Sequence, residues 1–226
     1  MVSAHQQRGY LTERQGEPAT ILVTGSHEIQ GGARDGVPTP QVVHTEALDF
    51  SFEPLRTTDL PSLATWLSRP HVERWWREPS DINSIEQNYL PMLDGSDPTE
   101  AFIARLSGRQ IGYVQRYLID DDPDWAESIR SVLGDSGGIG IDYLIGEPDL
   151  VGKGMGRQMI SQFVHHSWRR YPSGNRIAVA VQQDNVASWK ALEAAGFRRA
   201  WEGHLESSDP SDRGPSFMYV VDRVRG

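Results

Sequence analysis

Residues 138–156 combine one carboxylate with a run of glycines in a single short stretch. Apolar residues alternate along its first half, which predicts a strand, and Asp142 lies inside that strand. A turn with Gly152, Gly154 and Gly156 follows, and an amphipathic segment begins directly after it. A strand, a glycine turn and a helix start together direct several backbone N–H groups toward one anion. The stretch therefore predicts an anion site with Asp142 beside it.

The spacing of these glycines excludes two common phosphate motifs. A P-loop reads G-x-x-x-x-G-K-[ST], but here five residues separate Gly146 from Gly152, and Gly154 follows the lysine. The dinucleotide fingerprint G-x-G-x-x-G also fails, because Gly152, Gly154 and Gly156 are evenly spaced. We therefore expect the pyrophosphate of a different coenzyme, with Asp142 facing an amine next to it.

Acidic residues are concentrated around this stretch. The net charge is −9, and residues 120–149 alone contribute −8, from nine acidic residues and one arginine. Nucleic-acid binding needs a basic surface, so we expect no nucleic-acid partner. An acidic cleft would attract a polycation, whereas an acidic loop in solvent would bind nothing. Composition alone leaves both alternatives open.

Composition also limits the location and the chemistry. The 226 residues include no cysteine, so we expect no disulfide, no thiolate metal site and a cytoplasmic location. No apolar run has membrane length, and residues 1–30 lack a signal-peptide pattern, so we expect no membrane partner. His165 and His166 are adjacent on a predicted helix and point apart, so they cannot bind one metal together.

The elements that would position the site begin near Leu48. Residues 1–45 are polar and predict a flexible extension or a hairpin, whereas residues 46–226 predict one domain. Periodicity predicts strands near 48–52, 102–106, 111–117, 139–145, 177–181, 197–201 and 218–221, and helices near 58–67, 81–89, 154–170 and 185–195. We expect an acidic loop before the central strand, and we expect Pro91 to stop the second helix. This order predicts an α+β fold with helices on both faces of one mixed sheet.

Two segments resemble signatures of the GNAT superfamily of N-acetyltransferases. The turn V-G-K-G-M-G resembles the pyrophosphate loop Q/R-x-x-G-x-G/A, with Val151 at the first position. Downstream, N-V-A-S-W-K-A-L-E-A-A-G-F resembles N-x-x-A-x-x-x-Y-E-x-x-G-F, with Ser188 at the alanine and Leu192 at the tyrosine. The resemblance covers roughly residues 48–223. It implies the GNAT fold, whose mostly antiparallel sheet is splayed in the middle.

The resemblance also implies that acetyl-CoA is the co-substrate and that no metal is needed. Backbone amides would make most of the contacts, so Val151 in place of Gln or Arg is a small departure. The residues expected to contact the coenzyme are Tyr143, Leu144, Ile145, Val151, Gly152, Lys153, Gly154, Met155, Gly156, Arg157 and Asn185.

Further segments resemble the aminoglycoside 6'-N-acetyltransferases within that superfamily. They are H-V-E-R-W-W, N-Y-L-P, I-G-Y-V-Q-x-Y, a Trp-bearing acidic loop, G-I-D and G-K-G-M-G, in that order. By position, Asp142 matches the aspartate that contacts the reacting amine and is proposed as its base. Trp76 matches an aromatic wall of the antibiotic pocket, and Asp124 and Trp125 match recognition residues of the acidic loop. Asp212 matches an aspartate that binds amino groups of the sugar rings.

The chemistry of Asp142 can also be argued without the resemblance. An ammonium is not a nucleophile, so the site must accept a proton and hold the free amine near the acyl group. A strand carboxylate can do this directly or through water, and backbone N–H groups after it, such as that of Leu144, can face an oxyanion. In the alternative interpretation, Asp142 only accepts hydrogen bonds from a neighbouring turn. The tryptophans likewise would only fill the core and would not line a substrate pocket.

The predicted function is acetyl-CoA-dependent acetylation of the 6'-amine of aminoglycosides, conferring resistance, by a monomer or homodimer. Transfer would be direct, in a ternary complex, because no cysteine can carry the acetyl group. Leu192 replaces the tyrosine proposed to protonate the thiolate, but a thiol titrates at about 8.5, so water can protonate it. Ala180 replaces an aspartate of some relatives.

Two alternatives to this function remain open. One is acylation of a siderophore hydroxylysine or a polyamine. Siderophore relatives place a catalytic histidine before the strand aspartate, and residues 73–164 contain no histidine. The other is a non-catalytic protein that binds acyl-CoA or a drug, which the replacements at Leu192 and Ala180 would fit.

Overall fold

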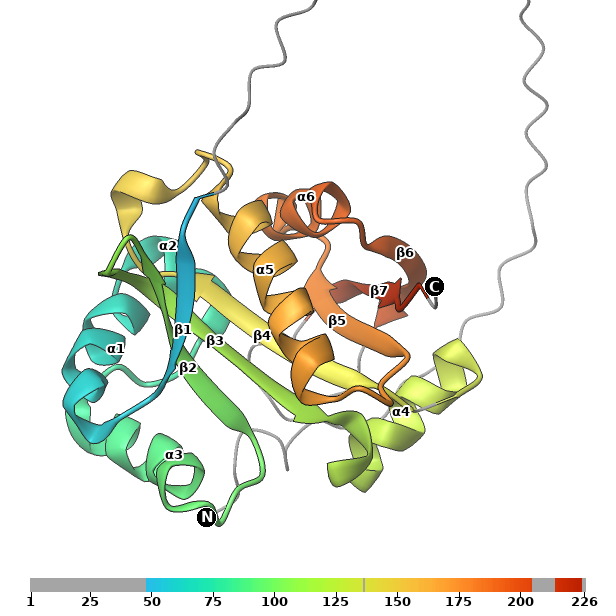
Figure 1. Cartoon of the computed structure of the whole chain (residues 1–226), viewed down its shortest axis with the longest axis horizontal. Helices are drawn as coiled ribbons and strands as arrows, with labels where there is room; N and C mark the ends of the chain where they lie inside the picture. Colours follow the sequence, from blue (N-terminus) through green and yellow to red (C-terminus); the bar gives the residue numbers. More distant parts are fainter. Residues whose placement is uncertain (1–47, 136, 205–213, 225–226) are drawn as a thin grey trace, which may run out of the picture. The chain divides into compact units, whose positions relative to one another are not determined.

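The computed structural model describes residues 48–135, 137–204 and 214–224, so the predicted extension at residues 1–45 lies outside the described residues. Seven strands form one sheet in the order β1-β2-β3-β4-β5-β7-β6 (Figure 1). They are β1 (Phe50–Pro54), β2 (Glu100–Leu106), β3 (Arg109–Leu118), β4 (Ile139–Ile145), β5 (Arg176–Gln182), β6 (Arg198–His204) and β7 (Pro215–Asp222). Each overlaps a strand that the alternation of apolar residues predicts.

The sheet is antiparallel except at its centre. All neighbouring strands pair antiparallel apart from β4 and β5, which are parallel. These two strands pair at Ile139 with Ile177 and at Gly140 with Ala178, and then diverge toward their C-terminal ends. We call the resulting gap between β4 and β5 the splay. The predicted mixed sheet that is open in its middle is confirmed.

Six α-helices accompany the sheet within the described residues. They are α1 (Leu60–Leu67), α2 (Pro70–Trp76), α3 (Ile82–Asp94), α4 (Pro123–Leu133), α5 (Met155–Arg170) and α6 (Val186–Ala194). Three 3-10 turns join them to the strands: η2 (Thr57–Asp59), η3 (Ile119–Asp121) and η4 (Pro148–Leu150). The four predicted helices are confirmed, and α2 and α4 are additional to the prediction.

The helix α3 does not end at Pro91 as predicted. Its N-cap is Asp81, whose side chain accepts a hydrogen bond from the Ser84 amide, and it continues to Asp94. A proline inside a helix removes the donor to the carbonyl four residues earlier. That carbonyl belongs to Gln87, which is exposed, so water can replace the lost donor. The helix ends instead at Gly95, which has a φ of 80°.

The predicted acidic loop is largely a helix, α4. Asp122 caps it by accepting hydrogen bonds from the amides of Asp124 (3.1 Å) and Trp125 (3.0 Å), and Pro123 occupies the first turn. Ala126 and Ile129 bury the same side of the helix as Trp125. The many carboxylates of this segment led to the prediction of a loop, although the helix cap and the apolar spacing are both present in the sequence.

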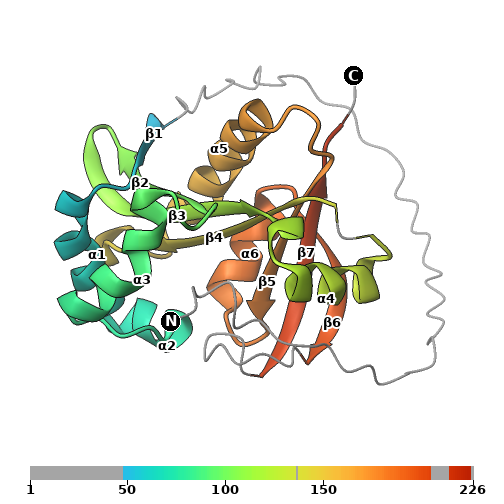
Figure 2. The same ribbon diagram turned by 90° about the horizontal axis from the view of Figure 1, so that it is seen from below.

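The helices cover both faces of the sheet, as predicted. On one face, α5 and α6 pack on strand residues such as Ile141, Val179 and Val181. On the opposite face, α1, α2 and α3 pack on β2–β4, and α4 packs on β5 and β7 (Figure 2). Ile141 and Tyr143 face α5, so Asp142 and Leu144 face the opposite side, where α1–α4 lie.

Candidate active site

Asp142 lies on β4 where the splay begins, and it is partly buried. Its neighbour across the β3–β4 pair is Gln115, whose Nε2 donates to Asp142 Oδ2 (2.9 Å). Gln115 Oε1 in turn accepts a hydrogen bond from the Tyr113 hydroxyl (2.6 Å). The predicted base is therefore held by a neutral donor on the strand beside it.

A second carboxylate, Glu78, lies near the same tyrosine. It accepts hydrogen bonds from Trp76 Nε1 (2.7 Å) and from the Tyr89 hydroxyl (3.0 Å). The rings of Trp76 and Tyr89 both meet Tyr113 edge to face, with centroid distances of 5.9 and 5.7 Å. Burial raises the pKa of Tyr89 well above its usual value, and the Glu78 charge raises it further.

Sequence reasoning identified Trp76 but missed Glu78. Trp76 is partly buried, at the end of α2, and Glu78 follows two residues later. A carboxylate two residues after an aromatic pair was a signal in the sequence, but nothing in the pattern indicated which face of the sheet it would join. The structure joins it to the face that carries Asp142 and Tyr113.

The backbone of β4 beyond Asp142 presents polar groups to the splay. The Gly146 amide donates to Ile111 O on β3 (2.8 Å), and the register from there to Leu144 is regular. Backbone groups alternate in direction, so those of Leu144 point to β3, and those of Tyr143 and Ile145 point to the splay. The prediction that the Leu144 amide could face an oxyanion is wrong for this reason. Ile145 O is hydrogen-bonded by His71 Nε2 at 3.0 Å.

The glycine turn after β4 leads directly into α5. Gly152 and Gly154 have φ values of 73° and 77°, a region that other residues rarely adopt, and an added Cβ would meet nothing within 4 Å. Glycine is thus required here by conformation rather than by space. The first helical bond runs from the Gln158 amide to Gly154 O (3.4 Å), so the preceding amides have no helical acceptor.

The side chains of this turn add positive charge. Lys153 and Arg157 are exposed, and Val151 is 42% exposed, whereas Met155 and Gly156 are partly buried. Free first-turn amides at a helix N-terminus, with cations beside them, make an anion site. The structure brings these predicted coenzyme residues together in one turn.

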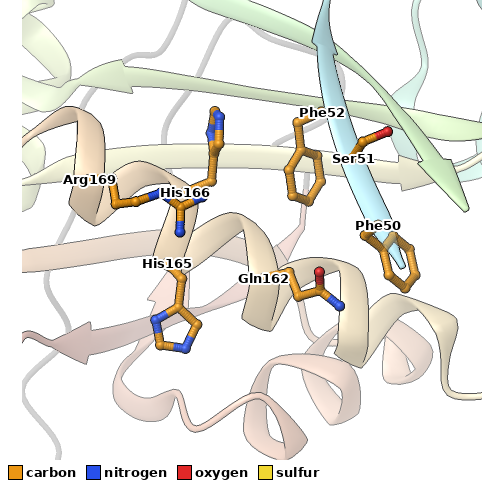
Figure 3. A pocket seen from close by; sticks show the side chains of 7 residues that line it. All are labelled: Phe50, Ser51, Phe52, Gln162, His165, His166 and Arg169. Carbon is orange, nitrogen blue, oxygen red and sulfur yellow. The ribbon is translucent and has the colours of Figure 1, made fainter. Parts of the chain in front are cut away.

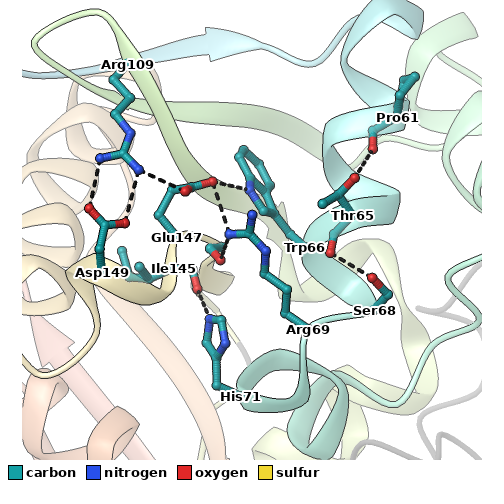
Figure 4. A network of polar contacts seen from close by, with 11 residues as sticks. Pro61, Thr65, Trp66, Ser68, Arg69, His71, Arg109, Ile145, Glu147 and Asp149 are labelled. Atoms are coloured by element: carbon teal, nitrogen blue, oxygen red, sulfur yellow. Dashed lines mark hydrogen bonds and ion pairs between the residues drawn. The ribbon is translucent and has the colours of Figure 1, made fainter.

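A charged network fixes the end of β4 just before the turn (Figure 4). Glu147 accepts from Trp66 Nε1 (2.9 Å) and pairs with Arg69 (3.1 Å) and Arg109 (2.9 Å). The Trp66 bond, together with the two arginines, holds the pKa of Glu147 below its usual value. Gly146 is necessary next to it, because a Cβ would lie 2.2 Å from the Trp66 ring.

On the other side of the splay, α6 begins at Asn185. Its side chain caps the helix by accepting from the Ser188 amide (3.2 Å). The Ser188 hydroxyl lies 2.8 Å from the Tyr143 hydroxyl, which connects α6 to β4. Burial raises the pKa of Tyr143 above its usual value, so this hydroxyl stays protonated. Leu192, at the family's tyrosine position, is fully buried in the core.

Two further predicted substrate residues, Asp124 and Trp125, lie on α4, which covers the same face of the sheet as Asp142. Asp124 is exposed in the first turn of α4. Trp125 is 3% exposed and packs in the core between α4 and the sheet, with Tyr117 and Met218. Trp125 therefore fills the core, as one of the two interpretations of the tryptophans expected. The loop that was predicted to present it to the substrate is a helix. Asp212 lies outside the described residues.

The acidic window is not a single free charge cluster. Glu147 and Asp149 pair with Arg109, Asp135 pairs with Arg176 (3.2 Å), and Glu127 pairs with Arg130. Asp120, Asp121 and Asp124 are exposed around the start of α4. The attraction of a polycation, one of the two alternatives left open by the sequence, is thus weakened by arginines, two of which come from the strands β3 and β5.

A pocket of about 500 Å³ lies between β1 and α5, on the face opposite to Asp142 (Figure 3). Its lining includes apolar rings and three basic or titratable side chains of α5, in the set Phe50, Ser51, Phe52, Gln162, His165, His166 and Arg169.

No helix among the described residues is both long and apolar enough to cross a membrane. In the same residues, no group of three or more His, Asp or Glu side chains could hold a metal ion.

Comparison with known proteins connects this site to a family. A family model described as acetyltransferase (GNAT) domain matches residues 56–205. Aminoglycoside N(6')-acetyltransferase type 1 of Klebsiella pneumoniae is 29% identical over 170 residues, which are 73% of this chain and 79% of that protein. Lysine N-acyltransferase MbtK of Mycolicibacterium paratuberculosis is 22% identical over 185 residues, which are 80% and 79% of the two chains.

A solved structure matches both the fold and the sequence. Aminoglycoside acetyltransferase AAC(6')-Ib, in complex with coenzyme A and kanamycin, has a TM-score of 0.65 and 27% identity. The match covers 77% of this chain and 95% of that one. The resemblance based on the glycine turn and the Asn185 segment is thereby confirmed. This chain belongs to the GNAT family of acetyltransferases.

Proposed function

We propose that this chain transfers the acetyl group of acetyl-CoA to a primary amine of a polycationic small molecule, specifically the 6'-amine of an aminoglycoside. The observation that carries the proposal is the β4–turn–α5 unit. It joins Asp142, the backbone edge at the splay and the anion-binding turn in one continuous stretch. The similarity to aminoglycoside acetyltransferases supports the choice of substrate.

The residues of the splay and the turn fit coenzyme A. Its pyrophosphate requires several N–H donors and positive charge, which the turn at Gly152–Gly156 supplies with Lys153 and Arg157. Its pantetheine arm carries amides, and the Tyr143 backbone groups and the Ile145 N–H, which face the splay, can pair with amides. When bound, acetyl-CoA supplies the acetyl group as a thioester.

The face with Asp142 fits an amine. Asp142 would accept a proton from the substrate ammonium, so that the free amine can attack the thioester carbonyl and displace the thiolate. Its partly buried position leaves it reachable by substrate or by water. Glu78 adds a second negative charge, and the partly buried Trp76 adds an aromatic ring. Carboxylates with aromatic rings suit an amino sugar that carries more than one ammonium group.

The proposal is tested by mixing the protein with acetyl-CoA and a panel of aminoglycosides and following free thiol. We expect thiol release that depends on the aminoglycoside, together with one acetyl group added to the drug. Calorimetric binding of the drug without thiol release across the panel would favour a non-catalytic binding protein instead.

A second candidate is acylation of a lysine-derived amine, which the similarity to lysine N-acyltransferase MbtK favours. The same assay discriminates the two, with lysine and hydroxylysine as acceptors. Faster thiol release with these acceptors than with any aminoglycoside would replace the first proposal by the second.

A further inference from the structure

We propose that Gln115 is a positioning residue that holds the Asp142 carboxylate for catalysis, and that Tyr113 sets the orientation of the Gln115 amide. This inference rests on the proposed role of Asp142 as the base. Gln115 and Tyr113 are 6% and 0% exposed, so neither is a surface group that happens to lie nearby. The three side chains form one line of hydrogen bonds on β3 and β4.

The orientation of the Gln115 amide follows from its two partners. An ionised carboxylate can only accept, so Gln115 must present its nitrogen to Asp142 (2.9 Å). Its oxygen then faces the Tyr113 hydroxyl, which donates at 2.6 Å. A reversed amide would place its oxygen against the carboxylate and lose the bond to Asp142, while its nitrogen could still donate to the Tyr113 hydroxyl. By donating to the Gln115 oxygen, Tyr113 favours the orientation in which the nitrogen faces the base.

The surrounding charges keep Tyr113 in its donating form. Burial raises the pKa of Tyr113 well above its usual value, and the charges of Glu78, Asp142 and Asp97 raise it further. Tyr143, the other tyrosine affected by the Asp142 charge, also has a raised pKa, chiefly through burial. The charges that raise the pKa of Tyr113 thus come from the carboxylates Glu78, Asp142 and Asp97, and Gln115 is the neutral donor between Tyr113 and Asp142.

This line of bonds positions the base and does not conduct its proton. A neutral amide has no free site that takes up a proton at neutral pH, so transfer from Asp142 to Tyr113 through Gln115 is not available. The proton that Asp142 accepts must leave from its exposed side, toward water. The role of Gln115 is to favour the charged carboxylate and to fix its direction.

The experiment compares Gln115→Leu with wild type in the thiol-release assay over a range of pH. Removing the donor disfavours the charged carboxylate, so the acid limb of kcat/KM should move to higher pH. We expect kcat/KM at neutral pH to fall roughly tenfold, because the base is misplaced rather than lost, with the KM for acetyl-CoA unchanged. A variant that only contained less folded protein would have a lower rate, but the acid limb of its pH profile would stay at the pH of wild type.

A matched control is available on the same strand. Gln110 Nε2 donates to Asp59 Oδ1 at 2.9 Å, so Gln110→Leu removes the same kind of bond away from the site. We expect its pH profile to superimpose on that of wild type. Tyr113→Phe keeps the ring and should move the acid limb in the same direction by a smaller amount. If Gln115→Leu does not fold, Tyr113→Phe serves as the test variant in its place.

A readout without turnover separates this inference from the proposed function. The carbon-13 shift of the Asp142 side-chain carboxyl should change in Gln115→Leu and stay constant in Gln110→Leu. If wild type shows no turnover but this shift responds, the proposed function fails and the positioning contact stands. If turnover is present and both the acid limb and the carboxyl shift are unaffected in Gln115→Leu, the positioning role is overturned.

Discussion

At the scale of single residues, Asp142 is distinguished by what surrounds it. Its strand position and one hydrogen bond from Gln115 give it a fixed direction, and the tyrosines beside it stay neutral. Asp142→Asn keeps the shape but cannot accept a proton. We expect turnover to fall by roughly tenfold or more, while acetyl-CoA binds as before in calorimetry.

The control for that variant is Asp135→Asn, which alters an exposed carboxylate paired with Arg176. Its turnover should match wild type, because this pair lies at the surface and is 56% exposed on the aspartate side. Near-normal turnover in Asp142→Asn would remove that residue from the mechanism.

Glu78 gives a second prediction at this scale. Its carboxylate is held by Trp76 and Tyr89 on the face of Asp142, so Glu78→Gln removes a negative charge expected to bind a substrate ammonium. We expect the KM for an aminoglycoside to rise roughly tenfold, with a smaller change in kcat, because a charge-assisted bond is lost. Glu127→Gln, on exposed α4, is the control. Equal KM values in the two variants would exclude Glu78 from substrate binding.

At the scale of elements, the turn between β4 and α5 depends on backbone conformation. Gly154→Ala would force a φ of 77° on a residue with a Cβ, which destabilises the fold by about 1 kcal/mol. It should also raise the KM for acetyl-CoA, because the turn amides would shift. The control is Gly134→Ala, which introduces the same strain at a φ of 82° at the end of α4. Steady-state kinetics should show a higher KM for acetyl-CoA in Gly154→Ala than in Gly134→Ala. An equal effect of both variants on this KM would contradict the anion site.

The packing of α5 on the sheet predicts a pH dependence of stability. His166 lies among phenylalanine rings, and its Nδ1 is 3.0 Å from the Arg116 guanidinium, which can only donate. Burial lowers the pKa of His166, and the charges of Arg116 and Arg169 lower it further. The unfolded chain therefore binds this proton more readily than the folded one. The contribution of neutral His166 to the free energy of unfolding is present above about pH 6.5. It is lost as the pH falls from there through the pKa of His166 in the folded state.

Urea unfolding at a series of pH values measures this contribution. Wild type should lose more free energy of unfolding than His166→Phe between about pH 7.5 and about pH 5. His165→Gln, which alters the exposed neighbour, should follow wild type. Parallel curves for wild type and His166→Phe would show that protonation of the partly buried His166 does not lower the free energy of unfolding.

Two elements show why part of the arrangement could not be predicted. Among the seven residues of α2, Val72 is the buried one, so the helix has almost no apolar periodicity, although Pro70 marks its start. The signals of α4, an Asp cap followed by proline and apolar spacing, were present but outweighed by its carboxylates. Local patterns predicted the strands well because apolar residues recur in them at the two-residue spacing of a pleated segment.

At the scale of the whole molecule, the sheet and the coenzyme turn followed from the sequence, whereas the partners of Asp142 did not. Gln115 and Glu78 reach that face through strand register and through packing of α2 and α3, and neither is encoded in a local pattern. The neutralisation of Glu147 by Arg109 has the same cause, since β3 supplies the arginine. Contacts between distant segments decide which acidic residues remain available to a substrate.

The most direct test of the account is a competition for the acetyl group. Wild type is incubated with acetyl-CoA and an equimolar mixture of kanamycin, spermidine and hydroxylysine, and the acetylated products are quantified by mass spectrometry and NMR. We predict that kanamycin takes most of the label, at its 6'-amine, and that Asp142→Asn lowers the amount of this product by roughly tenfold or more. Label found mainly on hydroxylysine or spermidine, or no label on any amine, would contradict it.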